Sequence, residues 1–250
     1  MNSSLYKYIL GVADNCLILG QRLGELCGHG PSLETDIACT NISLDLFGQV
    51  RSYYQYAAKV AGDKRTEDDI AMMRPEREYV NVLLVEQPNT DFAFTIVRQF
   101  LFDVYHYLFL NELQKSKDET LHAIARKSSK EVSYHLRFSS DWIKRLGDGT
   151  EESHSRMQQA LEDKIHYFEE LFIPTETETR LLKIGIAPDL SLIREKAYAK
   201  LNAVLQESTL SIPEDMYPQQ GGRSGNHTEY LGFILAELQY MQKSYPNLTW

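Results

Sequence analysis

The chain has 250 residues, of which 43% are hydrophobic and 24% are charged, as in an ordinary soluble globular protein. Its 35 acidic residues outnumber the 26 lysines and arginines, the formal net charge is -9, and no basic block stands out. Nucleic acid is therefore not expected as a partner. No run approaches the roughly 20 apolar residues of a membrane span, so no membrane is expected as a partner either.

The three cysteines, Cys16, Cys27 and Cys39, are odd in number and lack C-x-x-C spacing. A disulfide framework and a structural zinc site are both disfavoured, and reduced thiols are expected. Residues 1–8 lack the basic region and apolar core of a secretory signal. These features predict a cytoplasmic protein.

Apolar residues recur at steps of three and four along most of the chain, which is typical of amphipathic helices. A first long helix carries this spacing from Leu5 to Leu26 and ends at Gly28, and a second covers residues 36–61. A charged connector with one or two short helices then runs to Pro88. Its length indicates a crossover rather than a tight hairpin.

The third and fourth long helices are predicted from the capping residues that precede them. Asn89 and Asp91 can cap a helix that runs to about Lys115, and Asp118 can cap a helix over residues 119–146. These four helices form a predicted core bundle over about residues 4–147.

Further helices are predicted over about residues 151–245. A fifth ends before Pro174, residues 175–189 form a polar connector that docks loosely, a sixth covers about 189–206, and a last one covers about 231–245. The glycines at 221, 222 and 225 lack the phosphate-loop pattern and a preceding strand, so a plain loop is expected there. Strand-like alternation is scarce, and the prediction is one all-α domain over residues 1–250.

Acidic and imidazole side chains occupy positions where the helical spacing predicts the core. Glu131 and His135 lie on consecutive turns of the inward stripe of the fourth helix, and Asp103 lies in the apolar stripe of the third. Buried carboxylates are costly unless they are paired, protonated or bound to metal. The pattern therefore predicts a bundle whose centre holds, or once held, a dimetal site.

The order of the elements is that of a ferritin-like four-helix bundle, whose active members take about six metal ligands from one Glu and one Glu-x-x-His in each half. A spacing of three lets a carboxylate and an imidazole reach one ion. Here Asp45 is followed at three by Gly48, and Glu131 is followed at three by Tyr134 and at four by His135. No Glu-x-x-His exists at the expected places.

Four side chains remain as vestigial metal-site positions: Asp45, Asp103, Glu131 and His135. Because this set is too small for a di-iron centre, we expect no metal, no cofactor and no catalytic residue in this chain. We expect instead a neutralised network in which a protonated His135 bonds Glu131 or Asp103.

Two residues near this set have simpler interpretations. Asp45 lies one position off the apolar stripe of its helix, which favours an edge residue that pairs with Arg51 or another base. His106 follows Asp103 at a spacing of three, but we expect it on the helix flank rather than in the site.

Four segments of the chain closely resemble one protein family. They are residues 15–28 (NCLILGQRLGELCG), 84–99 (LVEQPNTDFAFTIVRQ), 134–138 (YHLRF) and 221–242 (GGRSGNHTEYLGFILAELQYMQ). The family is the non-catalytic, ferritin-like subunit, of the PaaC type, of the bacterial multicomponent phenylacetyl-CoA monooxygenase, also called the ring 1,2-epoxidase. The resemblance extends from Leu5 to Trp250.

This resemblance implies a partner, a homologous catalytic subunit that holds the di-iron centre and the acyl-CoA substrate. It also implies further small components and a reductase component that uses NADPH, and a homodimer is possible when the partner is missing. The chain would then be a duplicated subunit with a degenerate metal site, and residues 229–242 a helix for bundle packing or for contact between subunits. A di-metal carboxylate oxygenase active in its own right and an acyl-CoA binding subunit are the two alternative functions.

Overall fold

A computed structural model describes residues 2–245 of the chain, and every regular element among them is helical. The α-helices are α1 (Asn2–Gly24), α2 (Leu33–Ala61), α3 (Glu67–Met72), α4 (Leu83–Glu86), α5 (Phe92–Leu113), α6 (Glu119–Gly147), α7 (Glu151–Lys164), α8 (Glu176–Lys183), α9 (Leu190–Glu207), α10 (Glu229–Leu238) and α11 (Tyr240–Ser244). Short 3-10 turns are η1 (Glu76–Glu78), η2 (Ile165–Tyr167), η3 (Glu169–Phe172) and η4 (Gly222–Ser224). The prediction of an all-α fold is confirmed.

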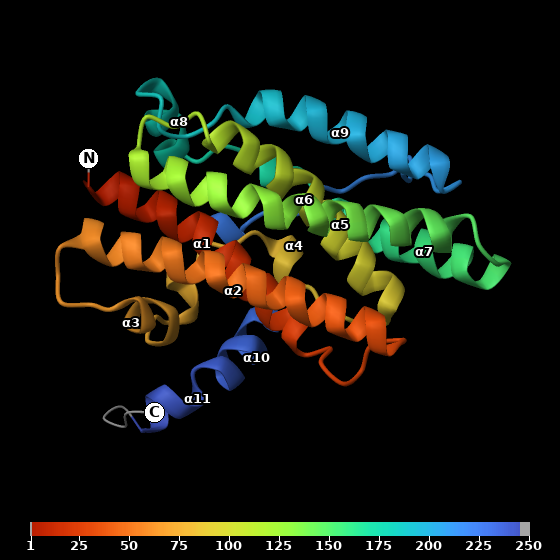
Figure 1. Cartoon of the computed structure of the whole chain (residues 1–250), viewed down its shortest axis with the longest axis horizontal. Helices are drawn as coiled ribbons and strands as arrows, with labels where there is room; N and C mark the ends of the chain where they lie inside the picture. Colours follow the sequence, from red (N-terminus) through yellow and green to blue (C-terminus); the bar gives the residue numbers. More distant parts are fainter. Residues whose placement is uncertain (1, 246–250) are drawn as a thin grey trace.

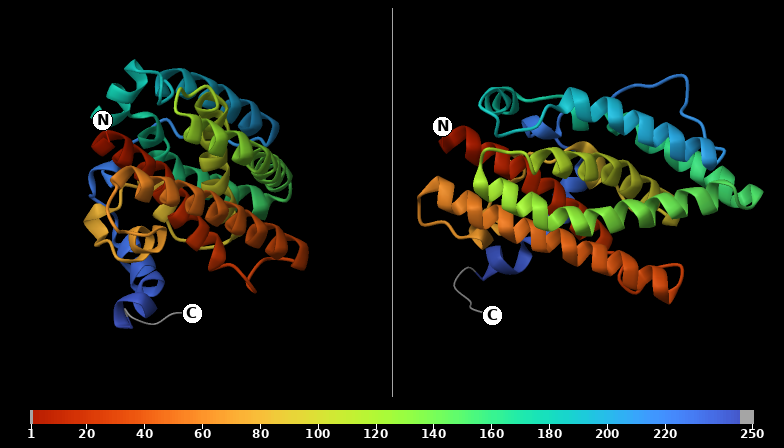
Figure 2. Two further views of the ribbon diagram at one scale, coloured as in Figure 1. Left: turned by 60° about the vertical axis from the view of Figure 1, so that its left-hand side comes forward. Right: turned by 45° about the horizontal axis from the view of Figure 1, so that its top comes forward.

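Helices α1, α2, α5 and α6 form the central bundle (Figures 1 and 2), in which the most extensive pairings are α1 with α2 and α5 with α6. The connector between α2 and α5 is the predicted crossover, and it contains α3, η1 and α4. Helices α7 and α9 each pack on both α5 and α6. Because α5 is enclosed by several neighbours, most of its residues are buried, and its sequence is apolar around nearly its whole circumference.

The helix starts follow the predicted caps with one exception. The carboxylate of Asp91 accepts a hydrogen bond from the Phe94 amide, and that of Asp118 accepts from the Leu121 amide. Asn89 does not cap α5, and its side-chain amide instead donates to the Arg22 carbonyl oxygen at 2.8 Å. This contact ties the crossover to the end of α1.

The prediction of a loosely docked connector over residues 175–189 is wrong. The segment contains α8, whose first turn is closed by reciprocal hydrogen bonds between Thr175 and Glu178. Leu181 on α8 is buried, and Glu178 forms an ion pair with Arg223 at 2.7 Å. The segment also buries Ile186 and Ala187. Because these apolar residues are few among many polar ones, the composition of the segment concealed its docking.

The two other C-terminal helices also differ from the prediction. The fifth helix is α-helical only to Lys164 and continues as the 3-10 turns η2 and η3 to Phe172. The last helix is divided into α10 and α11 at Gln239. The Gln239 side-chain amide is buried and donates to the Arg74 carbonyl oxygen and the Tyr79 hydroxyl, so this residue anchors the break to the crossover.

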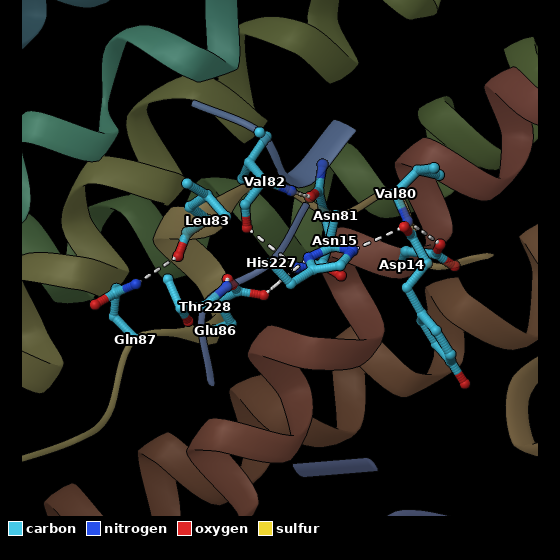
Figure 3. Close-up of polar contacts among 12 residues, drawn as sticks. Asp14, Asn15, Val80, Asn81, Val82, Leu83, Glu86, Gln87, His227 and Thr228 are labelled. Carbon is cyan, nitrogen blue, oxygen red and sulfur yellow. Dashed lines mark hydrogen bonds and ion pairs between the residues drawn. The ribbon is translucent and has the colours of Figure 1, made fainter. Parts of the chain in front are cut away.

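A buried ion pair joins the crossover to α1. The carboxylate of Asp14, which is fully buried, accepts hydrogen bonds from the Arg74 guanidinium at 2.6 and 3.0 Å and from the Val80 amide at 2.9 Å. The Tyr54 hydroxyl is a further donor, from α2. Figure 3 shows the contact between Asp14 and Val80 beside that between Asn15 and Val82. Adjacent polar residues of α1 therefore fix the path of the connector.

The Asp14→Asn substitution tests this assignment. It leaves the Arg74 charge buried without a counterion, so we expect the free energy of unfolding to fall by about 3–5 kcal/mol. Urea denaturation monitored by circular dichroism measures the change. The control is Asp63→Asn, which breaks an exposed ion pair with Arg65 and should leave the urea midpoint unaltered. Equal midpoints for Asp14→Asn and the wild type would contradict the assignment.

Candidate functional site

Asp103 lies at the centre of the bundle on α5 and is fully buried. Its carboxylate accepts a hydrogen bond from the Gln99 side-chain amide at 2.7 Å and one from the Ser139 hydroxyl at 2.8 Å. Burial raises the pKa of Asp103 to about 7, although nearby His135 and the two hydrogen bonds act in the opposite direction. A neutral carboxylic acid is therefore accessible here near neutral pH.

His135 on α6 is also fully buried, but its partner differs from the predicted one. Its Nε2 atom lies 3.0 Å from a carboxylate oxygen of Asp45 on α2, and the Asp45 side chain is 38% exposed. The predicted bond from His135 to Glu131 or Asp103 is therefore wrong. Asp45 is an edge residue with a basic partner, as one interpretation held, but the base is His135 and not Arg51.

Glu131 is only half-buried, so its predicted inward position is wrong. Its carboxylate accepts a hydrogen bond from the Gln49 side-chain amide at 3.2 Å. The buried face of α6 is turned by about one residue from the predicted stripe. It consists mainly of small or aliphatic side chains and His135: Leu121, Ala125, Ser128, Val132, His135, Ser139 and Ile143. Small residues let α5 approach closely, which leaves the larger Phe138 and Trp142 at the edge.

His106 was expected on a helix flank and is buried instead, with 2% of its surface exposed. Its Nε2 atom lies 4.0 Å from the Cys16 sulfur of α1, and this sulfur lies 4.0 Å from the Gln49 side-chain oxygen of α2. Burial, helped by the nearby His135, lowers the pKa of His106 to about 3. The ring is therefore neutral. Its spacing of three from Asp103 is the signal in the sequence that could have predicted a buried position for it.

The structure thus brings the four predicted positions into one region of the bundle but not into one coordination shell. Asp45 pairs with His135, Asp103 bonds Gln99 and Ser139, and Glu131 bonds Gln49 at the edge. Within residues 2–245, no group of three or more His, Cys, Asp or Glu side chains is arranged to hold a metal ion. A di-iron centre does not fit this donor set, because amide and hydroxyl groups occupy the carboxylate oxygens of Asp103.

A second polar cluster, which the sequence analysis missed, joins the crossover to the C-terminal segment (Figure 3). The Glu86 carboxylate accepts hydrogen bonds from the Thr228 amide at 2.7 Å and from His227 Nδ1 at 3.1 Å. The other ring nitrogen of His227 faces the Tyr79 carbonyl oxygen at 2.8 Å. Burial alone would lower the pKa of His227, but the hydrogen bonds with Glu86 and Tyr79 outweigh it and raise the pKa. An imidazolium that donates from both nitrogens suits this position.

The glycine-rich loop before α10 packs tightly on the same crossover. A Cβ atom at Gly222 would lie 2.1 Å from the Asn81 carbonyl oxygen, and Gly225 has a φ of 75°. The Gly221 amide donates to Glu170, whose carboxylate also accepts from the Leu83 amide. These contacts explain the glycines by close backbone approach. Segments 84–99 and 221–242, on which the resemblance partly rests, therefore lie against each other.

The helices described above and their hydrogen-bonded polar centre define a ferritin-like helical bundle. Over residues 2–245, none of the helices combines the length and the hydropathy of a membrane span. The Phenylacetic acid catabolic protein family matches residues 1–250, and the chain belongs to this family. It is 46% identical over 248 residues to an Escherichia coli (strain K12) protein that is named as one of the subunits of 1,2-phenylacetyl-CoA epoxidase. The match covers 99% of this chain and 100% of that protein. The resemblance seen in the sequence is confirmed.

The Asp103→Asn substitution tests the electrostatics of the bundle centre. In the wild type, Asp103 binds its proton more tightly in the folded state, with a pKa of about 7, than in the unfolded chain, where it is about 3.9. Its contribution to stability is therefore present at low pH and is lost as the pH rises toward 7. Asparagine keeps the shape of the side chain without its charge. We therefore expect the free energy of unfolding of the variant to be higher than that of the wild type by about 1–3 kcal/mol at pH 8, and by less at pH 5.

Urea denaturation of both proteins between pH 5 and pH 8 measures this difference. The exposed Asp141 of α6 supplies the control, since Asp141→Asn should give the same pH profile as the wild type. A constant difference between Asp103→Asn and the wild type over this pH range would show that Asp103 does not titrate as described.

Proposed function

We propose that this chain is a non-catalytic structural subunit of a phenylacetyl-CoA ring 1,2-epoxidase complex, in which it pairs with and stabilises a homologous catalytic di-iron subunit. The observation that carries the proposal is the pairing of Asp45 with His135, of Asp103 with Gln99 and Ser139, and of Glu131 with Gln49. Each candidate ligand already has a protein partner. The name of the E. coli relative, an epoxidase subunit, supports the same conclusion.

The remaining components belong to the same proposal. The di-iron centre resides in the catalytic partner, and NADPH is used by a reductase component, with further small components completing the complex. The present chain needs no cofactor for this role. We further propose that it works in the cytoplasm, and that it forms a homodimer when the partner is missing.

The C-terminal arm, defined here as α10 and α11, offers a surface for contact with another subunit. It extends away from the bundle (Figures 1 and 2), and α11 packs mainly on α10. Its inner face is buried, but three large side chains on its outer face are exposed, with Phe233 at 67%, Tyr240 at 59% and Met241 at 40%. Aromatic residues in such positions are typical of protein interfaces. The role in contact between subunits that we expected for residues 229–242 therefore remains our proposal for this arm.

The double substitution Phe233→Ser and Tyr240→Ser tests the arm. If these rings fill pockets on the catalytic partner, their loss should weaken the complex by about tenfold or more, because buried aromatic anchors dominate interface energies. Co-purification of the tagged chain with its co-expressed catalytic homologue, followed by titration of the two purified proteins, measures the effect. Leu192→Ser is the matched control, since Leu192 is 51% exposed but lies on α9. Unchanged affinity would exclude the arm from the interface.

The double substitution Glu131→Gln and His135→Gln tests the absence of catalysis in the bundle centre. We expect lower folding stability or weaker assembly, by about 1–3 kcal/mol, because the buried imidazole is removed and Asp45 loses its partner. Turnover per assembled complex should stay within about twofold of the wild type, since a ΔΔG‡ below about 0.4 kcal/mol corresponds to such a change. Steady-state oxidation of phenylacetyl-CoA at matched complex concentration gives this value. Normal assembly with lost turnover would refute the structural role.

The first alternative function, a di-metal carboxylate oxygenase, makes a different prediction from the structural subunit for the isolated chain. A di-metal oxygenase would retain about two irons per folded chain, whereas the structural subunit should retain none after purification in iron-replete medium. Metal analysis by mass spectrometry decides between them.

A further inference from the structure

A pocket of about 690 Å³ lies where five segments distant in sequence meet. They are the first half of α1, the crossover between Arg65 and Val80, α5 at Tyr105, the first turn of α8 and the turn η4. Helices α1 and α8 contact each other, and Figure 1 shows the start of α1 beside α8. The volume is within the range of small-molecule sites in proteins. Neither the bundle centre nor the C-terminal arm forms part of it.

The charge of the pocket is opposite to that of the chain. Its charged lining comprises the basic residues Lys7, Arg65, Arg74, Arg77 and Arg223 and the acidic residues Glu78, Glu176 and Glu178. Arg74 is committed to Asp14 and Arg223 to Glu178. Lys7 and Arg77 are exposed and form no ion pair with any residue between 2 and 245. In a chain of net charge -9, such cations at a pocket attract anions.

The wall of the pocket is apolar and includes a buried tyrosine. Tyr8 lines it and is only 4% exposed, and its hydroxyl is shut off from solvent and has no hydrogen-bond partner among the described residues. Burial, the largest cause, and neighbouring Glu178 raise the pKa of Tyr8 well above its ordinary value, so the phenol keeps its proton. A buried hydroxyl without a partner costs free energy. Leu10 and Val80 supply apolar surface beside it.

We propose that this pocket binds a small organic anion that has an apolar part. Its phosphate or carboxylate group lies against Lys7 and Arg77, and its apolar part packs on Leu10 and Val80. Such a ligand matches both the exposed cations and the apolar wall, since binding sites combine apolar surface with a few convergent polar groups. The binding activity is additional to the proposed structural role.

Isothermal titration of the isolated full-length chain with three probes tests the proposal. Phenylacetyl-CoA carries phosphates, a carbonyl acceptor and an aromatic ring, octanoate carries a carboxylate on an apolar chain, and inorganic phosphate has no apolar part. We expect at least one of the first two to bind with a Kd below about 1 mM, and inorganic phosphate to bind at least about tenfold more weakly. The stronger of the two organic probes identifies whether the anionic group is a phosphate or a carboxylate.

Variants locate the binding. The double substitution Lys7→Ala and Arg77→Ala should weaken binding of the better organic probe by about tenfold or more. Lys64→Ala is the matched control, because Lys64 is exposed and adjacent to Arg65 but does not line the pocket. Circular dichroism checks that each variant is folded.

Three results would overturn the proposal: no binding of either organic probe, equal binding of inorganic phosphate, or equal weakening by Lys64→Ala. The titration needs no partner subunit. Failure of the pocket proposal is therefore distinguishable from failure of the structural role, which is tested by assembly and turnover of the complex.

Discussion

The requirement that buried charges find partners within the protein governs this structure. Asp14 receives donors from α2 and from the crossover, and Glu86 receives donors from the C-terminal segment. An unpaired charge at either position would cost several kcal/mol. Burial of apolar surface is not directional, so it does not fix which segment packs at a given place. Hydrogen bonds are directional, and those of these carboxylates fix the positions of the segments that donate them.

The same requirement explains the chemistry of the bundle centre. Burial favours the protonated form of Asp103 and the neutral form of His106, and the His135 ring contacts a carboxylate that is partly exposed. The centre thus carries little net charge without a metal ion. A dimetal site works in the opposite way, since its carboxylates are anionic and the cations balance them. This balance of charge is consistent with the structural role proposed above.

If the centre is structural, specific recognition lies at the periphery. The C-terminal arm is anchored at Gln239 and by the contacts of His227, while its outer face exposes Phe233 and Tyr240. The pocket beside α8 is lined by α1, by the crossover and by the turn η4, which packs on the crossover. The buried network and the two proposed recognition surfaces are therefore parts of one arrangement.

The sequence by itself determined the long helices, most of their caps, their order and the family, because apolar spacing, capping residues and long motifs are local properties of the chain. It also placed Asp103 and His135 in the core. Only the tertiary structure decided that Glu131 lies at the edge, that His135 pairs with Asp45, that His106 is buried and that α8 docks. Adjacent helical residues differ by about 100° in direction, so spacing defines a face only to within about one residue. Contacts between side chains of different helices depend on how distant segments pack, as for Asp45 and His135, which are 90 residues apart. No local sequence pattern predicts such a contact.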